Sequence, residues 1–382
     1  MKYKLKQIAE VTMGQSPKSE YYNNEGKGYP FLQGNRTFGL KYPTFDTYTT
    51  VMTKAAKAGD VIMSVRAPVG DLNITPMDMC LGRGVCSLRM RNGNQDFLYY
   101  MMKYYMPQLL NKESGTVFGS VNRNDINGLE VEIPEDAEVQ EKIARYLKLI
   151  DDKIELNIAI NNNLEQQAEA IFQSILSNAI TTVNLGEIAD VKGGKRLPKG
   201  VNLIDIPNAH PYIRVRDLNN ALFASLTPNY AYVDKETQKS ISRYIVSTGD
   251  VLISIVGTIG LTAIVDSTLD KANLTENCVK VTNLKHITPE YLLLYLRSQF
   301  GREAIAKGTV GAVQQKLPIK NIQAIPIPLL SEKDKNALFC TLDSIFAGIS
   351  NNVIQSAKLA SLRDTLLPRL MSGELDVSYI DL

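Results

Sequence analysis

The chain carries an internal repeat of about 190 residues, and this repeat limits the possible fold more than any other feature. The sequence LKQIAEV at 5–11 returns as LGEIADV at 185–191, and GDVIMSVRAPVG at 59–70 returns without a gap as GDVLISIVGTIG at 249–260. This period is far longer than the roughly 20–50 residues of solenoid and propeller repeats. We therefore expect a duplicated domain whose two copies are related by a pseudo-two-fold axis.

Weaker matches predict the same elements in both copies. The helical stretch at 97–110 has its counterpart at 290–306, and short runs typical of β-strands surround both. Each copy ends on a strand that contains Ile-Pro, LEVEIP at 129–134 and IQAIPIP at 322–328. Because helices and strands do not alternate regularly, the pattern favours an α+β domain over a doubly wound parallel sheet.

Two acidic segments, 135–180 and 331–382, carry the spacing of a coiled-coil seam. Ten positions in each segment are spaced alternately by four and three residues, which indicates a long helix that pairs with another helix. The first seam consists of Ile143, Leu147, Ile150, Ile154, Asn157, Asn161, Leu164, Ala168, Ile171 and Ile175. The second, 195 residues later, consists of Leu338, Leu342, Ile345, Ile349, Asn352, Ser356, Leu359, Arg363, Leu366 and Leu370.

A pseudo-two-fold axis requires the two helices to pair antiparallel. Asn157 then lies opposite Ser356 and Asn161 opposite Asn352, and polar layers of this kind fix the register of a coiled coil at some cost in stability. Helices of about 35–40 residues would extend roughly 50–60 Å. Only Arg363 breaks the apolar match between the seams. The alternative is that each helix packs on its own domain.

The formal charge divides the chain in the same way as the repeat. Residues 1–134 hold 16 Lys and Arg against 12 Asp and Glu, and residues 181–330 hold 17 against 12. The acidic residues dominate in 135–180, with 4 against 9, and in 331–382, with 5 against 7. We expect two globular domains at 1–134 and 181–330, and two long helices at 135–180 and 331–382, the last with a C-terminal tail. Basic domains suit nucleic-acid backbones, although an excess this small also arises by chance.

Composition excludes several other classes of protein. The longest uncharged apolar stretch, Val251 to Val265, is shorter than the ~18–20 residues that span a bilayer. The N-terminus lacks the apolar core of a secretion signal. Four cysteines without a CxxC pair and only two histidines argue against a disulfide framework and a zinc site. We therefore expect a cytoplasmic chain that binds no metal.

Polar loops of the two globular segments supply the expected DNA contacts. Arg and Lys hydrogen-bond to guanine, and Asn and Gln to adenine, in the major groove. The candidates in the first segment are Gln33, Asn35, Arg36, Arg66, Asn122, Arg123 and Asn124. The candidates in the second segment are Lys195, Arg196, Arg214, Arg216, Gln314, Gln315 and Lys316. Each of them alone is equally compatible with a solvated surface or turn residue, so the prediction depends on the set.

Catalytic motifs are absent or incomplete. The sequence GGKR at 193–196 resembles a phosphate-binding loop, but Ala189 and Arg196 occupy positions that need Gly and Ser or Thr. The sequence TPNY at 227–230 lacks the Asp or Asn and the second Pro of a methyltransferase motif, and no GxSxG supports a serine hydrolase. Asp60 and Asp250 follow glycine before a strand and are explained as turn residues. The sequence predicts a non-catalytic chain.

In this combination of features the chain resembles the specificity (S) subunits of type I restriction–modification systems. The likeness rests on the GDV strands and the Ile-Pro strands described above, on QEKIARYLKLIDDKIELN at 140–157 and on LLPRLMSGEL at 366–375. It covers essentially the whole chain. It implies an α+β fold with two target-recognition domains separated by an intramolecular antiparallel coiled coil, each domain reading one half of a bipartite DNA sequence.

The resemblance also implies partners. Two methyltransferase (M) subunits would dock on the helices, and restriction (R) subunits would join them. S-adenosylmethionine, ATP and Mg would then belong to those partners, with no cofactor bound by this chain. Off-seam apolar residues that repeat, Ile158 with Val353 and Phe172 with Leu367, are the expected docking surface. Packing of these residues against the chain's own domains is equally compatible.

Two other functions remain open at this stage. The first is a coiled-coil scaffold that binds only proteins, with incidental basic domains. The second is a nuclease or methyltransferase in its own right, which lacks every expected motif.

Overall fold

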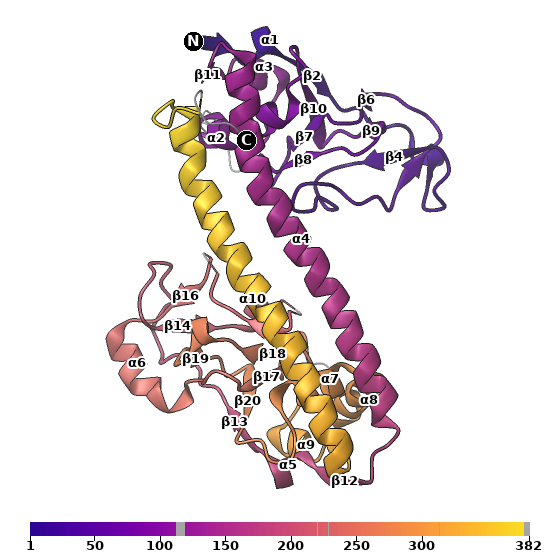
Figure 1. The fold of residues 1–382 in the computed structure, drawn as a ribbon, viewed down its shortest axis with the longest axis vertical. Helices are drawn as coiled ribbons and strands as arrows, with labels where there is room; N and C mark the ends of the chain where they lie inside the picture. Colours follow the sequence, from indigo (N-terminus) through magenta and orange to yellow (C-terminus); the bar gives the residue numbers. More distant parts are fainter. Residues whose placement is uncertain (112–118, 220, 228, 313, 378–382) are drawn as a thin grey trace. The chain divides into compact units, whose positions relative to one another are not determined.

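The computed structural model describes residues 1–111, 119–219, 221–227, 229–312 and 314–377 (Figure 1). Contacts divide the chain into two compact units. Unit 1 comprises Met1–Asn157 and Gln355–Leu382, and unit 2 comprises Ile158–Ile354. Each unit therefore contains one copy of the repeat and part of each long helix.

Unit 1 is built on an antiparallel four-stranded sheet. Its strand order is β2-β10-β7-β8, with β2 at Ala9–Met13, β10 at Val85–Met90, β7 at Val61–Ser64 and β8 at Leu72–Ile74. A second sheet has the order β3-β5-β4-β9-β6, with strands Tyr22–Asn23, Tyr48–Thr49, Tyr29–Leu32, Met79–Leu81 and Ala55–Ala56. Strand β1 (Lys2–Lys4) pairs with β11 (Glu130–Glu132), and short helices α1 (Leu5–Ile8) and α3 (Arg123–Asn127) lie beside β2.

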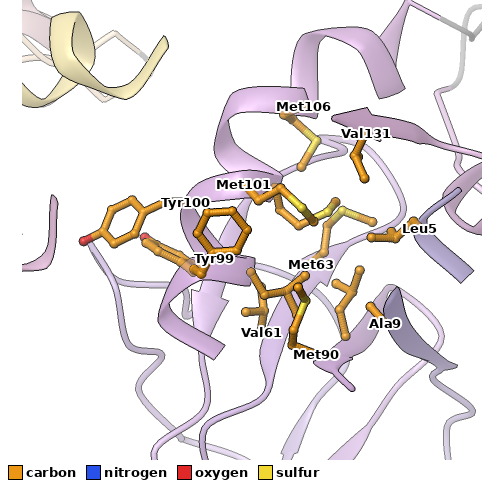
Figure 2. Close-up of a cluster of buried hydrophobic side chains, with 14 of the residues drawn as sticks. Leu5, Ala9, Val61, Met63, Met90, Tyr99, Tyr100, Met101, Met106 and Val131 are labelled. Carbon is orange, nitrogen blue, oxygen red and sulfur yellow. The ribbon is translucent and has the colours of Figure 1, made fainter. Parts of the chain in front are cut away.

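Helix α2 (Gln95–Leu110) closes the core of unit 1 against the four-stranded sheet. Figure 2 shows side chains of β7 and α1, among them Leu5 and Met63, gathered against Tyr99 and Met101 of α2. All four side chains are almost completely removed from solvent. Successive side chains of each strand point to opposite faces of the sheet, so one face packs against this cluster, as expected for a half-buried antiparallel sheet.

Unit 2 repeats this plan. Its main sheet has the order β13-β20-β17-β18-β15, with strands Asp190–Gly193, Cys278–Thr282, Val251–Ser254, Thr262–Val265 and Phe223–Ala224. A three-stranded sheet has the order β16-β14-β19, with strands Ala231–Tyr232, Pro211–Ile213 and Asn273–Leu274. Strand β12 (Thr181–Asn184) pairs with β21 (Pro326–Leu329), and the short helices are α5 (Leu185–Ile188), α6 (Lys235–Ile241) and α9 (Ile319–Gln323). The predicted α+β duplication is confirmed.

The repeat extends to individual hydrogen bonds. Asp60 accepts from the backbone N–H of Lys57 at 2.8 Å and pairs with Arg89, and Asp250 accepts from Ser247 at 2.8 Å and pairs with Lys280. Both carboxylates are buried and close the turn before a core strand. They have the structural role that the sequence assigned to them.

One predicted element differs from the structure. The stretch 290–306 forms two helices, α7 (Pro289–Arg297) and α8 (Gln299–Gly308), instead of one. Ser298 between them is extended, and its hydroxyl accepts from the N–H of Gly301 at 3.3 Å, which starts a new helix. The corner is tight, because a Cβ at Gly301 would lie 2.1 Å from the carbonyl oxygen of Tyr295.

The two predicted long helices are α4 (Ala137–Leu176) and α10 (Glu332–Met371), each of 40 residues. Within unit 1, Asp151 and Asn157 of α4 contact Arg363 and Ser356 of α10. Within unit 2, Asn161 contacts Asn352. Residue numbers rise along α4 while those of its partners in α10 fall, so the helices pair antiparallel within each unit (Figure 1).

Helix α10 is also long and apolar enough, by length and composition, to cross a membrane. Packing within the chain covers part of its apolar surface. Its seam residues Leu338, Leu342 and Ile349 belong to the core of unit 2, and Leu367 and Leu370 belong to the core of unit 1.

Candidate nucleic-acid interface

Backbone hydrogen bonds in unit 1 bring five separate loops together. We call residues 14–16, 33–34, 65–66, 82–84 and 120–122 loop cluster 1. The N–H of Gly82 donates to the carbonyl of Leu32 beside Gln33 at 2.8 Å, the N–H of Val65 to Gly84 at 2.9 Å, and the N–H of Val121 to Val65 at 3.1 Å. The cluster thus assembles three of the predicted contact residues, namely Gln33, Arg66 and Asn122.

Unit 2 builds the same cluster from equivalent residues. We call residues 194–196, 213–214, 255–256, 275–277 and 316–318 loop cluster 2. The N–H of Thr275 donates to the carbonyl of Ile213 at 3.1 Å, that of Ile255 to Asn277 at 2.8 Å, and that of Leu317 to Ile255 at 3.0 Å. This cluster contains four predicted contact residues, namely Lys195, Arg196, Arg214 and Lys316.

Two predicted contacts of unit 1 are engaged by carboxylates outside the cluster. Asn35 donates to Asp71 at 2.5 Å, and Arg36 forms an ion pair of 2.7 Å with Asp46. The hydrogen bond from Arg36 holds the pKa of Asp46 below its usual value. Arg36 is still 75% exposed, and with Gln33 it lines a pocket of about 350 Å³.

Asn122 and Arg123 have structural contacts that account for them. The side chain of Asn122 caps α3 by accepting from the backbone N–H groups of Asn124 and Asp125, and Arg123 donates to the carbonyl of Val11 at 2.7 Å. The spacing of Asn122 and Asp125 is that of a capping box, so the sequence contained this signal. Asn124 is exposed on the first turn of the helix.

Arg214 is not available as the sequence suggested. Its guanidinium forms two hydrogen bonds with the carboxylate of Asp217, at 2.8 and 2.9 Å, and its side chain is only 17% exposed. This mostly buried ion pair uses the fork formed by Nε and Nη2, so that side of the guanidinium is not free for a base edge. Arg216, which is 71% exposed, is the better candidate of the two.

Arg196 and Lys195 lie at the edge of loop cluster 2. Arg196 is 82% exposed and pairs with Glu276 at 2.7 Å, a hydrogen bond that raises the pKa of the guanidinium. Burial raises the pKa of Glu276, but the hydrogen bonds it accepts, led by that from Arg196, outweigh this and lower it overall. The ammonium of Lys195 lies 5.5 Å from the centre of the Tyr244 ring.

Gln314, Gln315 and Lys316 lie on an exposed hairpin of unit 2. Val310 and Lys316 exchange two backbone hydrogen bonds of 2.9 Å, and Gly311 turns the chain with φ of 103°. Lys316 also forms a bridge with Val256, the counterpart of Arg66, which itself bridges Ser120. Lys316 thus belongs to loop cluster 2, and the exposed Gln314 and Gln315 directly precede it.

The four polar seam residues lie opposite one another in the pairs given by the spacing. Asn157 is fully buried and donates to Gln355 at 2.8 Å and to Ser356 at 3.2 Å. Asn352 donates to Asn161 at 2.8 Å. That these layers set the register of the helices stays a prediction.

We expect Asn157→Ala to lower the free energy of unfolding of unit 1 by about 1–3 kcal/mol, because it removes a fully buried amide that donates two hydrogen bonds across the seam, to Gln355 and Ser356. Asn162→Ala, on an exposed position of the same helix, should change it by less than about 0.5 kcal/mol. Urea unfolding followed by circular dichroism measures both. Equal effects of the two substitutions would contradict the role of the polar layer.

An ion pair across the seam was not foreseen in the sequence. Arg363, the one break in the apolar match, donates to the buried carboxylate of Asp151 at 2.7 Å, and Tyr100 of α2 donates to the same carboxylate at 2.8 Å. Burial and the negative charge of Asp151 raise the pKa of Tyr100. The acidic partner precedes its arginine by 212 residues, so only the antiparallel register could have identified it.

Two of the four predicted docking residues are wrong. Phe172 is 1% exposed and packs against Tyr291, with ring centres 5.0 Å apart, in the core of unit 2. Leu367 is 9% exposed and belongs to the core of unit 1. Both therefore serve the chain's own domains. Val353 is partly buried against the core of unit 2, and Ile158 is 44% exposed.

The described residues offer little support for a metal site or a catalytic nucleophile. Among them, no group of three or more His, Cys, Asp or Glu side chains is placed to hold a metal ion. Burial raises the pKa of the thiols of Cys86 and Cys278 to about 12, so neither is a ready nucleophile.

Duplicated α+β domains with paired long helices and polar loop clusters define a two-domain recognition subunit. The chain matches the model of the type I restriction modification DNA specificity domain over residues 1–166 and 179–358. It belongs to this family, and the predicted class, a non-catalytic subunit that confers DNA sequence specificity, is confirmed.

The chain is also similar to individual proteins that are named as specificity subunits. The chain is 37% identical over 173 residues to a Methanocaldococcus jannaschii protein named provisionally as the MjaX type I restriction enzyme specificity subunit; this match spans 45% of the chain and 40% of that protein. It is 23% identical over 419 residues to the MjaIX specificity subunit of the same organism, with 99% and 94% covered. The S subunit structure from M. genitalium shares the fold, with a TM-score of 0.60 at 17% identity over 97% of this chain and 95% of that one.

Proposed function

We propose that each unit reads one half of a bipartite DNA target through its loop cluster, and that α4 and α10 set the distance between the two halves. The observation that carries the proposal is the construction of the same loop cluster twice, from equivalent hydrogen bonds in the two units. Exposed Arg, Lys and Gln side chains in and beside both clusters provide the donors that base edges accept. Phosphate contacts by the basic loops would add affinity that falls steeply with salt.

Both long helices pass from one unit into the other without interruption. A continuous pair of helices is suited to fix a spacing, because its length changes only by whole residues, about 1.5 Å each. This supports a role for the helices in selecting the spacer between the half-sites.

Selection from randomised DNA duplexes with the assembled complex tests the proposal. The wild-type chain should select two fixed half-sites with a constant spacer. Seven residues are then inserted after Asn157 and seven after Ile354, at the boundaries between the units, so that the contacts within each unit are retained. We expect a longer spacer and unchanged half-sites.

Each half-site serves as the internal control, because only the distance should change. An unchanged spacer would contradict the role of the helices. A wild-type chain that selects no motif would contradict the whole proposal and favour a scaffold that binds proteins only.

We further propose that methyltransferase subunits dock on an exposed apolar face of the long helices, and that restriction subunits join them. In unit 1, Leu149 and Leu156 of α4 are 53% and 52% exposed, and Leu362 of α10 is 47% exposed. Leu149 and Leu156 are seven residues apart and so share one face of the helix. These leucines replace Phe172 and Leu367 as the proposed docking residues. A chain that works on DNA with such partners would act in the cytoplasm.

A further inference from the structure

A turn at 82–85 presents Arg83 at the edge of loop cluster 1. The N–H of Val85 donates to the carbonyl of Gly82 at 3.2 Å, which places Arg83 at a corner of the turn. The backbone N–H of Arg83 donates to the hydroxyl of Ser16 at 3.1 Å. The backbone of Arg83 is therefore fixed, while its side chain is exposed.

Two glycines flank this arginine for a steric reason. A Cβ on Gly82 would lie 2.7 Å from the Cα of Gln33, and a Cβ on Gly84 would lie 2.4 Å from the carbonyl oxygen of Gln33. Contacts this short to backbone atoms do not occur in folded proteins. The two glycines thus let the turn pack directly on the backbone at Gln33. Arg83 is the long side chain that the turn carries.

The guanidinium of Arg83 has no hydrogen bond or ion pair with the residues that the structure describes. Two other exposed arginines of unit 1 are neutralised, Arg36 by Asp46 and Arg91 by Glu10. An unpaired, positioned guanidinium keeps its planar fork of donors free for a ligand.

The equivalent turn of unit 2 carries the opposite charge. It spans 275–278 and is closed by the N–H of Cys278 on the carbonyl of Thr275 at 3.1 Å, so Glu276 occupies the corner. Glu276 is bound by Arg196 at 2.7 Å, and Ser16 is the counterpart of Arg196 in unit 1. The residue at this corner is therefore an arginine that is unpaired among the described residues of unit 1, whereas in unit 2 it is a glutamate neutralised by Arg196.

We infer that Arg83 reads a guanine in the half-site recognised by unit 1. The inference rests on the proposed function of the loop clusters. A guanidinium can donate two parallel hydrogen bonds to O6 and N7 of guanine, a contact that discriminates against the other bases. Its neighbours Gln33 and Arg66 in loop cluster 1 lie beside it to contact adjoining bases or phosphates. The corresponding corner of unit 2 makes no such contact.

Selection from randomised duplexes with wild-type, Arg83→Ala and Arg91→Ala chains in the assembled complex tests this. The Arg83→Ala chain should lose the preference for guanine at one position of one half-site and bind the wild-type site about 5- to 150-fold more weakly. The other half-site should be unchanged. Arg91→Ala, which removes an exposed but paired arginine of the same unit, should select the wild-type motif, and equal melting temperatures of all three chains verify folding.

The outcomes separate the inference from the function on which it rests. A wild-type chain that selects no bipartite motif refutes the proposed function. A wild-type motif that Arg83→Ala reproduces at every position refutes the inference alone. A uniform loss of affinity by Arg83→Ala, with no position relaxed, identifies a phosphate contact and also overturns it.

Discussion

Replacing Arg363 by leucine should lower the free energy of unfolding of unit 1 by about 3–5 kcal/mol, because it leaves the carboxylate of Asp151 buried without its cation. Asp151 is 3% exposed, and after the substitution the hydroxyl of Tyr100 would be its one remaining side-chain donor among the described residues. The loss should appear in urea unfolding as a lower midpoint with an unchanged slope.

Two further variants isolate the buried pair. The double variant Asp151→Leu, Arg363→Leu should recover most of the lost stability, because apolar residues of similar volume commonly replace a buried ion pair at little or no cost. Arg369→Leu, which removes the exposed ion pair between Arg369 of α10 and Glu374 beyond its end, should cost no more than about 1 kcal/mol. A single-variant loss as small as that of Arg369→Leu would show that the seam does not depend on the pair.

Phe172→Ala should lower the free energy of unfolding of unit 2 by about 3–5 kcal/mol, through lost burial and the cavity that remains. The ring lies edge-on to Tyr291, which in turn lies 5.8 Å from Phe339 of α10. These two ring contacts thus connect both long helices to Tyr291 of α7. Thermal unfolding of the full chain measures the effect as a lower transition temperature.

Leu156→Ala is the matched control on α4. Its side chain is half exposed, so stability should change by less than about 0.5 kcal/mol, while capture of the methyltransferase subunit should weaken. If Phe172→Ala left the stability unchanged and weakened capture instead, the original assignment of Phe172 to a docking surface would be restored.

The contacts of the polar seam residues could be anticipated because they follow from two regular features of the sequence. The 4-3 spacing gives the face of each helix, and the 195-residue repeat gives the partner, so that Asn161 and Asn352 could be paired before any coordinates. The ion pair of Arg363 with Asp151 depends instead on a residue beside the seam, whose side chain reaches inward only in the assembled helices.

The loop residues were harder to judge, because residue type does not reveal what a side chain already contacts. Arg214 and Asp217 are three residues apart, and this local spacing could have indicated their pairing. Arg83 was missed because a lone arginine between two glycines has no signal of its own. Its position becomes informative only when the contacts of Gly82 and Gly84 with Gln33 are known.

Division of the chain into a continuous and a discontinuous unit has a consequence for biosynthesis. Unit 2 is a single stretch, Ile158–Ile354, whereas unit 1 needs residues from Gln355 onward to complete its core. Since domains generally fold as units while the polypeptide emerges from the ribosome, the part translated first would be the last to mature. Until then the apolar surface of unit 1 that Leu367 and Leu370 cover would stay exposed.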